Sequence, residues 1–163
     1  MSRVVLVTGS TSGIGEETAL RFAALGDQVI FNSVRSISEG EALVTRQQIS
    51  GWGGIDSRTG TIVETRHELR GVSFAGKVLV FSGAKGSSGW SNAFHLTRTF
   101  GVSPAAMLFN EMTTKVALGA VVTRAPCVTD FDHDPLDLIE TGDWVKVDAN
   151  RGIVEITKRS KSK

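Results

Sequence analysis

The sequence lacks tyrosine and has a single cysteine among its 163 residues. Without tyrosine, no reaction that uses a phenol as its acid or base can be assigned to this chain. One thiol, Cys127, cannot form an internal disulfide, and alone it cannot hold an iron–sulfur cluster or a structural zinc ion. We therefore expect a protein of a reducing compartment, the cytoplasm, that binds no metal by itself.

Neither sign of charge dominates, because 18 Lys and Arg residues stand against 17 Asp and Glu residues, a net charge of +1. This balance argues against nucleic acid or an acidic membrane surface as a partner. The apolar run at residues 4–7 is too short for a signal peptide or a membrane span, so we expect neither. The one local charge excess is a basic tail at residues 158–163, which we expect to be solvated.

The N-terminal segment has the pattern of a β-loop-α-β unit. The apolar run at residues 4–7 predicts a buried parallel strand, and residues 28–34 predict a second one. Between them, a glycine-rich loop at residues 8–15 precedes a helical pattern over residues 16–25. The loop fits T-G-x-x-x-G-x-G, in which glycines let the backbone approach a pyrophosphate at a helix N-terminus.

This segment resembles the short-chain dehydrogenase/reductase family. The resemblance implies NADP rather than NAD, because Asn32, Ser33 and Arg35 follow the second strand where an acidic residue would favour NAD. It implies a phosphate site made by Gly9, Ser10, Ser12, Gly13, Ile14 and Gly15. The family's catalytic tyrosine and its Asn-Asn-Ala-Gly element are absent, so hydride transfer is not expected. Two alternatives stay open: a relic or fused fragment without function, and non-catalytic NADP binding.

The most informative segment is Gly-Ala-Lys-Gly-Ser-Ser-Gly-Trp-Ser at residues 83–91. An apolar strand predicted over residues 77–81 leads into it, and an amphipathic helix predicted over residues 92–100 leads out. Glycine amides and a helix N-terminus at such a turn can hold an anion or stabilise an ionised hydroxyl. The sequence therefore predicts an anion-binding or catalytic loop here.

Within this loop Ser87 is the candidate base. A serine hydroxyl is a weak acid, but backbone amides and a helix N-terminus stabilise its ionised form, in which it can act as a base. Ser88 and the amides of Gly86 and Gly89 are candidate anion donors, and Lys85 adds positive charge. The alternative is that Ser87 only caps the helix, and the two roles can coexist.

The rest of the chain alternates short strands, short helices and turns. A glycine-dense loop surrounds Trp52 over residues 47–60, and Asp56 within it either orients a substrate group or caps a turn. We expect strands over residues 41–45, 61–65, 105–109 and 120–123, a helix over residues 111–118 ended by Gly119, and a hairpin of residues 144–147 and 153–156. This mixture predicts an α/β fold in a compact β/β/α arrangement.

From about Glu39 onward the chain resembles the aconitase X family, at its small subunit or swivel domain. The resemblance covers about three quarters of the chain. It is carried by the segments Glu39-Gly40-Glu41-Ala42-Leu43-Val44, Trp52-Gly53-Gly54-Ile55-Asp56, Thr59-Gly60, Gly71 to Val80, Gly86-Ser87-Ser88, Gly101 to Ala106 and Gly142-Asp143.

The resemblance implies a compact swivelling domain similar to domain 4 of aconitase. It implies one subunit of a heteromeric hydro-lyase that dehydrates a hydroxylated carboxylic acid of the hydroxyproline or phosphomevalonate class. The iron or iron–sulfur centre would belong to an aconitase X large subunit. Ser87 would be catalytic, and the substrate-binding residues would be Gly86, Ser88, Gly53, Gly54, Asp56 and Lys85.

We therefore expect three parts: a reductase-like βαβ fragment at residues 1–35, a swivel domain at residues 36–157 and the basic tail at residues 158–163. The expected function is the small subunit of a dehydratase that is inactive alone. The alternative from another class is a non-catalytic NADP-binding or relic fusion protein. Only the first reading requires the hydroxyl of Ser87.

Overall fold

A computed structural model describes residues 4–7, 28–31 and 37–160 of the chain. The chain divides into two compact units, Met1–Ser33 and Val34–Lys163. In the first unit, β1 (Val4–Val7) and β2 (Gln28–Phe31) pair in parallel, with Val4 opposite Gln28. Both predicted strands are therefore present over the described residues, and residues 32–34 of the second prediction lie outside them. The glycine loop and helix predicted between them lie outside the described residues.

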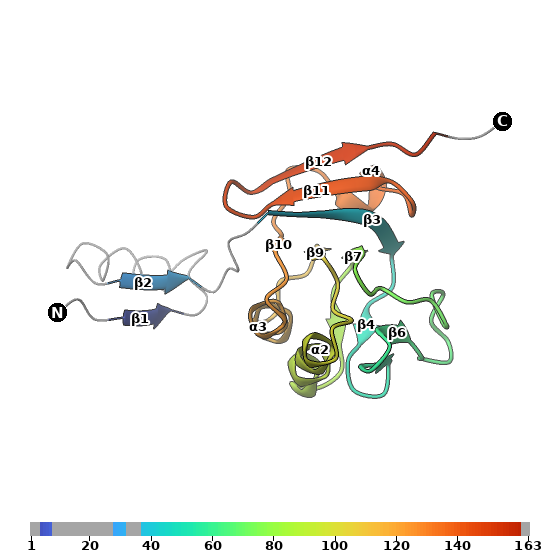
Figure 1. The fold of residues 1–163 in the computed structure, drawn as a ribbon, viewed down its shortest axis with the longest axis horizontal. Coiled ribbons are helices and arrows are strands. Elements are labelled where there is room, and N and C mark those ends of the chain that lie inside the picture. The colour runs from blue at the N-terminus through green and yellow to red at the C-terminus, as the bar shows by residue number, and fades with distance from the viewer. Residues whose placement is uncertain (1–3, 8–27, 32–36, 161–163) are drawn as a thin grey trace. The chain divides into compact units, whose positions relative to one another are not determined.

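The second unit is built on a six-stranded sheet with the order β10-β9-β7-β3-β11-β12 (Figure 1). Strands β10, β9, β7 and β3 run parallel, and β11 runs antiparallel to both β3 and β12. The predicted C-terminal hairpin is confirmed by β11 and β12. The bounds are β3 (Ile37–Thr45), β7 (Val78–Phe81), β9 (Ala106–Phe109), β10 (Cys127–Val128), β11 (Trp144–Asp148) and β12 (Ile153–Thr157).

Two apolar cores lie on the two faces of this sheet. Leu79 and Phe81 of β7 share one core with residues of α2 (Gly89–Thr99) and α3 (Thr114–Thr123). Val78 and Val80 share the other core with Leu136 of the short helix α4 (Pro135–Leu138). A strand covered on both faces has no solvent side, which explains why β7 and β9 are continuous apolar runs rather than alternating ones.

The core beneath α2 is aromatic. Trp90, in the first turn of α2, is buried and stacks on Phe94 with ring centroids 4.0 Å apart. Its indole N–H donates to the carbonyl of Ile49 at 2.9 Å. Because a buried indole needs such a partner, this bond fixes the start of α2 against the strand that contains Ile49.

Helix α3 differs from the prediction. The expected helix over residues 111–118 begins instead at Thr114, and it continues through the residues expected to form a strand at 120–123. Gly119 does not end the helix: it lies inside, where a Cβ atom would stand 2.2 Å from the Trp90 ring. The helix ends at Arg124, which has a left-handed φ of 58°, and Pro126 follows. The strand after it is β10, so the predictions of the Gly119 cap and of the 120–123 strand were wrong.

Two small ribbons lie outside the main sheet. Strand β4 (Ile49–Ser50) pairs in parallel with β8 (Ala84–Lys85), and β5 (Ile55–Asp56) pairs antiparallel with β6 (Thr61–Ile62). The strand predicted over residues 61–65 is thus confirmed only for its first two residues. No helix among the described residues is long and apolar enough to cross a membrane.

The first residues of the basic tail are exposed, as expected, but two of them are also hydrogen-bonded to the domain. The ammonium of Lys158 donates to Oδ2 of Asp143 at 2.9 Å, and the N–H of Arg159 donates to Oδ1 at 3.0 Å. Asp143 itself is buried. A charged carboxylate in such a place needs donors, and the tail supplies two of them.

Candidate functional site

The pairing of β4 with β8 brings together the two loops that the sequence marks as functional. Ile49 lies opposite Ala84, and Ser50 lies opposite Lys85. Because the strands are parallel, the Trp52 loop at residues 51–54 and the serine loop at residues 86–88 leave from the same end of the ribbon. These loops are separated by more than thirty residues in the sequence, and the ribbon makes them neighbours.

Glycine is required in the Trp52 loop because the backbone packs closely there. A Cβ atom at Gly51 would stand 2.5 Å from the Cα atom of Trp90, and one at Gly54 would stand 2.3 Å from the carbonyl oxygen of Ser50. A larger residue at Gly51 would push the loop away from the start of α2, and one at Gly54 would disrupt the turn within the loop itself. Gly51 therefore permits the close approach of the Trp52 loop to the start of α2, and Gly54 permits the turn of the loop.

Ser87 is exposed at the turn before α2. Its Oγ accepts a hydrogen bond from the N–H of Gly89 at 3.3 Å, and its carbonyl accepts from the N–H of Trp90 at 3.1 Å. Because Ser87 precedes the N-terminus of an eleven-residue helix, negative charge on its oxygen is favoured by the helix dipole. The arrangement suits a hydroxyl that must carry charge. The capping position of α2 is Ser88, without a side-chain capping bond, so the alternative that Ser87 is the helix cap is not supported.

Trp52 stands beside this serine. The tryptophan side chain is 68% exposed, although the residue is large and apolar. A Cβ atom built on Gly89 would lie 3.4 Å from the Ser87 Oγ and 4.0 Å from the Trp52 Cβ. The two side chains therefore approach each other across Gly89, which has no side chain of its own to separate them.

Asp56 is engaged within its own loop. One carboxylate oxygen accepts from the N–H of Arg58 at 2.9 Å, and the other accepts from the hydroxyl of Thr59 at 2.9 Å. The bond from the Arg58 N–H, with that from Thr59, lowers the pKa of Asp56. Asp56 and Gly53 also line an open cavity of about 370 Å³ beside Trp52, so the geometry gives Asp56 a turn contact and a place beside a cavity.

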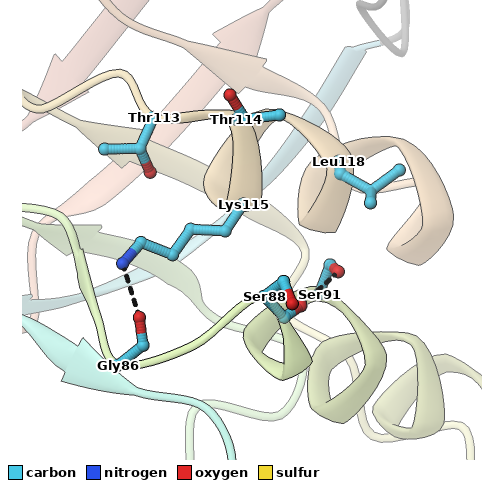
Figure 2. A pocket seen from close by; sticks show the side chains of 7 residues that line it. All are labelled: Gly86, Ser88, Ser91, Thr113, Thr114, Lys115 and Leu118. Atoms are coloured by element: carbon cyan, nitrogen blue, oxygen red, sulfur yellow. Dashed lines mark hydrogen bonds between the residues drawn. The ribbon is translucent and has the colours of Figure 1, made fainter.

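The ammonium of Lys85 is not available to the serine loop as an unpaired charge. Its ammonium pairs with Glu64 at 2.6 Å. The lysine at the loop is instead Lys115, whose ammonium donates to the carbonyl of Gly86 at 2.8 Å (Figure 2). Lys115 belongs to the first turn of α3, so a helix thirty residues later in the chain supplies the cation that the sequence assigned to Lys85.

A second cavity, of about 340 Å³, lies between the start of α2 and the start of α3 (Figure 2). Gly86 and Ser88 line it from the serine loop, and Thr113 and Lys115 line it from α3. Sequence reasoning missed Thr113 and Lys115. The available signal was the pair Thr113-Thr114, a typical helix start, which the prediction of a helix beginning at residue 111 obscured.

The described residues do not fit an iron or iron–sulfur centre. They contain no group of three or more His, Cys, Asp or Glu side chains that could hold a metal ion. Burial raises the pKa of the Cys127 thiol to about 11, whereas a ligating thiol must lose its proton. The residues predicted to hold NADP, at positions 9–15, lie outside the described part of the chain.

Comparison with known proteins identifies what this fold and these loops are similar to. Residues 30–156 match the family model described as the aconitase X swivel domain. The phosphomevalonate dehydratase small subunit of Methanosarcina mazei is 38% identical over 125 residues, which cover 77% of this chain and 87% of the relative. The protein of the same name from Archaeoglobus fulgidus is 43% identical over 122 residues, which cover 75% of this chain and 92% of the relative.

Solved structures agree with the sequence relatives. The crystal structure of aconitase X from Thermococcus kodakaraensis in its holo-form superimposes with a TM-score of 0.72 at 35% identity, covering 77% of this chain and 95% of the other. The solution NMR structure of a UPF0107 protein gives a TM-score of 0.70 at 40% identity, covering 77% of this chain and 96% of the other.

Proposed function

The chain belongs to the aconitase X swivel-domain family, and we propose that it is the small subunit of a hydro-lyase that dehydrates a phosphorylated hydroxy acid of the phosphomevalonate class. One observation carries the proposal: the loop with the exposed Ser87 is brought beside the Trp52 loop, within a chain that spans about nine tenths of the length of its dehydratase relatives. A reductase-type function has no comparable support, because the family model and the relatives match the swivel domain.

The proposed reaction removes a proton and a hydroxyl group from adjacent carbons. The Ser87 Oγ takes the proton from the carbon next to the carboxylate, and that C–H electron pair forms the new C=C bond. The C–OH bond breaks with its electron pair going to oxygen, so the hydroxyl leaves as hydroxide, which a proton from solvent converts to water. The Gly89 N–H and the α2 dipole stabilise the charge on Ser87 before the transfer. Among the described residues no titratable side chain contacts the Ser87 hydroxyl, so we assign its initial deprotonation to a group of the partner.

The other predicted site residues take different parts in this proposal. Gly86 and Ser88 flank the base and contact the substrate, together with Gly53, which has a left-handed φ of 76° and an open surface. Gly54 is needed for the conformation of the Trp52 loop, where a side chain would clash with Ser50. Asp56 and Lys85 remain candidates for substrate contact. Each already has a partner within this chain, since Asp56 accepts from the Arg58 N–H and Lys85 pairs with Glu64.

The proposal requires a large subunit. The relatives are named as small subunits, and an aconitase-type dehydratase implies an iron or iron–sulfur centre, which would polarise the leaving hydroxyl. Because the described residues offer no ligand set for that centre, we assign it to the large subunit. The proposal includes three parts of the chain, which are the reductase-like fragment at residues 1–35, the swivel domain at residues 36–157 and the tail at residues 158–163. It also includes a cytoplasmic location.

The test is a dehydration assay on the complex of this chain with an aconitase X large subunit. Replacement of Ser87 by alanine should reduce kcat by about three orders of magnitude, the usual loss for a positioned general base. Ser160→Ala, at an exposed serine in the tail, is the matched control and should leave kcat unchanged. Gel filtration of each variant with its partner separates a chemical loss from a failure to assemble.

Two results would overturn parts of the proposal. Full activity in an assembled Ser87→Ala complex would remove Ser87 as the base. A wild-type complex that dehydrates hydroxyproline but no phosphorylated hydroxy acid would replace the substrate class and leave the hydro-lyase reading intact.

A further inference from the structure

The cavity between α2 and α3 has the chemistry of an anion site. Helix α2 has eleven residues and α3 has ten, and neither has an acidic residue in its first turn. Both therefore present the positive end of the helix dipole toward the cavity without a carboxylate of their own to neutralise it. Two helix starts facing one space concentrate more positive potential there than either does alone.

The N-terminus of α3 is left open for a ligand. Thr113 occupies the capping position, but its side chain makes no capping bond. The N–H groups of Thr114, Lys115 and Val116 meet no acceptor outside the helix among the described residues. First-turn amides of a helix normally find a side chain, water or a ligand, so these three groups are available as donors.

The Thr113 hydroxyl is a second and independent sign. Its oxygen is buried and has no hydrogen-bond partner, and it points toward the Lys115 side chain in Figure 2. An unpaired buried hydroxyl destabilises the protein, because it has lost its hydrogen bonds to water without gaining others. A ligand that accepts its hydrogen would remove this cost, and the residue lines the cavity directly.

Lys115 provides the charge. Its ammonium has no carboxylate partner among the described residues, and its hydrogen bond is to the Gly86 carbonyl. A lysine ammonium is a mobile point charge with three donors, so it can turn from a neutral carbonyl to an anion without breaking an ion pair. Thr113 and Lys115 line the same cavity, so a ligand bound there lies beside both side chains.

We propose that this cavity binds the phosphate group of the substrate through the Lys115 ammonium, the Thr113 and Ser88 hydroxyls and the first-turn amides of α3. The inference rests on the proposed function, since it names where the phosphorylated end of the hydroxy acid lies. Gly86 and Ser88 line the cavity, and Ser87 stands between them. A substrate held by its phosphate in the cavity extends along the serine loop to the base.

The first experiment titrates inorganic phosphate into the full chain and follows the backbone amide signals by NMR. We expect the largest shifts at residues 114–116, with the Ser88 signal moving at the same dissociation constant. Lys115→Gln and Thr113→Val should each weaken phosphate binding about tenfold, the loss expected for one charge-assisted hydrogen bond.

The chain offers a close control for each variant. Thr123 also has a buried hydroxyl without a partner, at the opposite end of α3, so Thr123→Val makes the same chemical change away from the cavity. Lys146→Gln removes a lysine from β11, where it pairs with Glu155. Both controls should bind phosphate as the wild type does. Shifts spread over unrelated lysines, or equal affinity in Lys115→Gln and the wild type, would overturn the site.

The second experiment uses the complex with the large subunit and distinguishes free phosphate from the phosphorylated substrate. Lys115→Gln should raise KM for the phosphorylated acid about tenfold and leave KM for its unphosphorylated analogue unchanged. Equal KM values for the phosphorylated acid would show that the cavity holds only free phosphate and overturn the substrate role. Ser87→Ala should lose activity but keep phosphate binding, so failure of the base and failure of this site give different results.

Discussion

At Asp143 a single buried carboxylate holds three parts of the chain together. It accepts hydrogen bonds from the N–H of Glu140, the N–H of Arg159 and the ammonium of Lys158. Burial opposes the charged form, but these three donors outweigh it and lower the pKa of Asp143 below its ordinary value of 3.8. The residue therefore ties the start of β11 to the segment that follows β12.

Replacement of Asp143 by asparagine should lower the free energy of unfolding at pH 7 by about 2 kcal/mol, because the charge-assisted bond to Lys158 is lost. Since the carboxylate has a lower pKa in the folded state, its contribution is fully present above about pH 5 and is lost as the pH falls through the folded pKa. Urea unfolding at pH 7 and pH 3 measures both effects.

The variant should therefore lose less stability than the wild type between these two pH values. Asp132→Asn, at an exposed loop carboxylate, is the control and should follow the wild type. An Asp143→Asn curve parallel to that of the wild type would show that the tail bonds contribute nothing to stability.

Residues could be assigned to the candidate site from the sequence only where the residues next to them in the chain form a recognisable pattern. Gly86, Ser87 and Ser88 stand in one glycine-rich run before a helix, so their placement at an exposed turn follows from local sequence. Lys115 carried no such signal, because its approach to Gly86 depends on how α3 packs against α2. Lys85 was favoured by its position in the run, and a partner twenty-one residues earlier, Glu64, holds its charge instead.

Among the elements, α3 depends most on a contact that the sequence does not display. Gly119 lies in the middle of the helix, where glycine lowers helix stability. The Trp90 ring occupies the space that a side chain at this position would need. The cost of a helical glycine is offset by the close approach of α2 and α3, which also places the starts of both helices at one cavity.

Replacement of Gly119 by alanine should destabilise the protein by about 1–3 kcal/mol, although alanine is the better helix former. The reason is steric, since the new methyl group would stand 2.2 Å from the Trp90 ring. Thermal or urea unfolding of Gly119→Ala measures the change.

The double variant Gly119→Ala with Trp90→Phe is the sharper comparison. Phenylalanine leaves room for the methyl group, so the pair should be less destabilised than the sum of the two single variants. Additive effects would indicate that the ring and the glycine are not coupled, and that α3 tolerates a side chain at this position by moving away.

The elements that were predicted well are those whose own hydrophobic pattern fits only one kind of secondary structure. The β11–β12 hairpin is marked by two alternating runs around a polar turn, and β7 and β9 are apolar runs of strand length. The predicted ends of α3 were wrong because a glycine in an apolar stretch indicates the end of a helix when its packing partner is unknown. The pairing of β4 with β8 joins two strands of two residues each, which are too short to carry a pattern.

At the scale of the whole molecule, the described fold of the second unit is complete without the first. All six strands of the main sheet lie between Ile37 and Thr157, and the described members of both cores begin at Ala42. The solution structure of the UPF0107 protein matches this fold over 96% of its length and only 77% of this chain. A relative of this kind folds with little beyond the shared unit.

Removal of residues 1–33 should therefore leave the second unit folded, with an unfolding midpoint within about 3 °C of the full chain. A change of 1 kcal/mol would already shift the midpoint of a domain of this size by about 4 °C. Differential scanning calorimetry of both chains, with gel filtration of each beside the large subunit, measures folding and assembly together.

A fall of 10 °C or more in the unfolding midpoint would mean that the N-terminal unit supplies part of the swivel fold. A stable shortened chain that no longer binds the large subunit would instead give that unit a place in the interface. If both properties are retained, neither the sheet nor its assembly depends on the reductase-like segment.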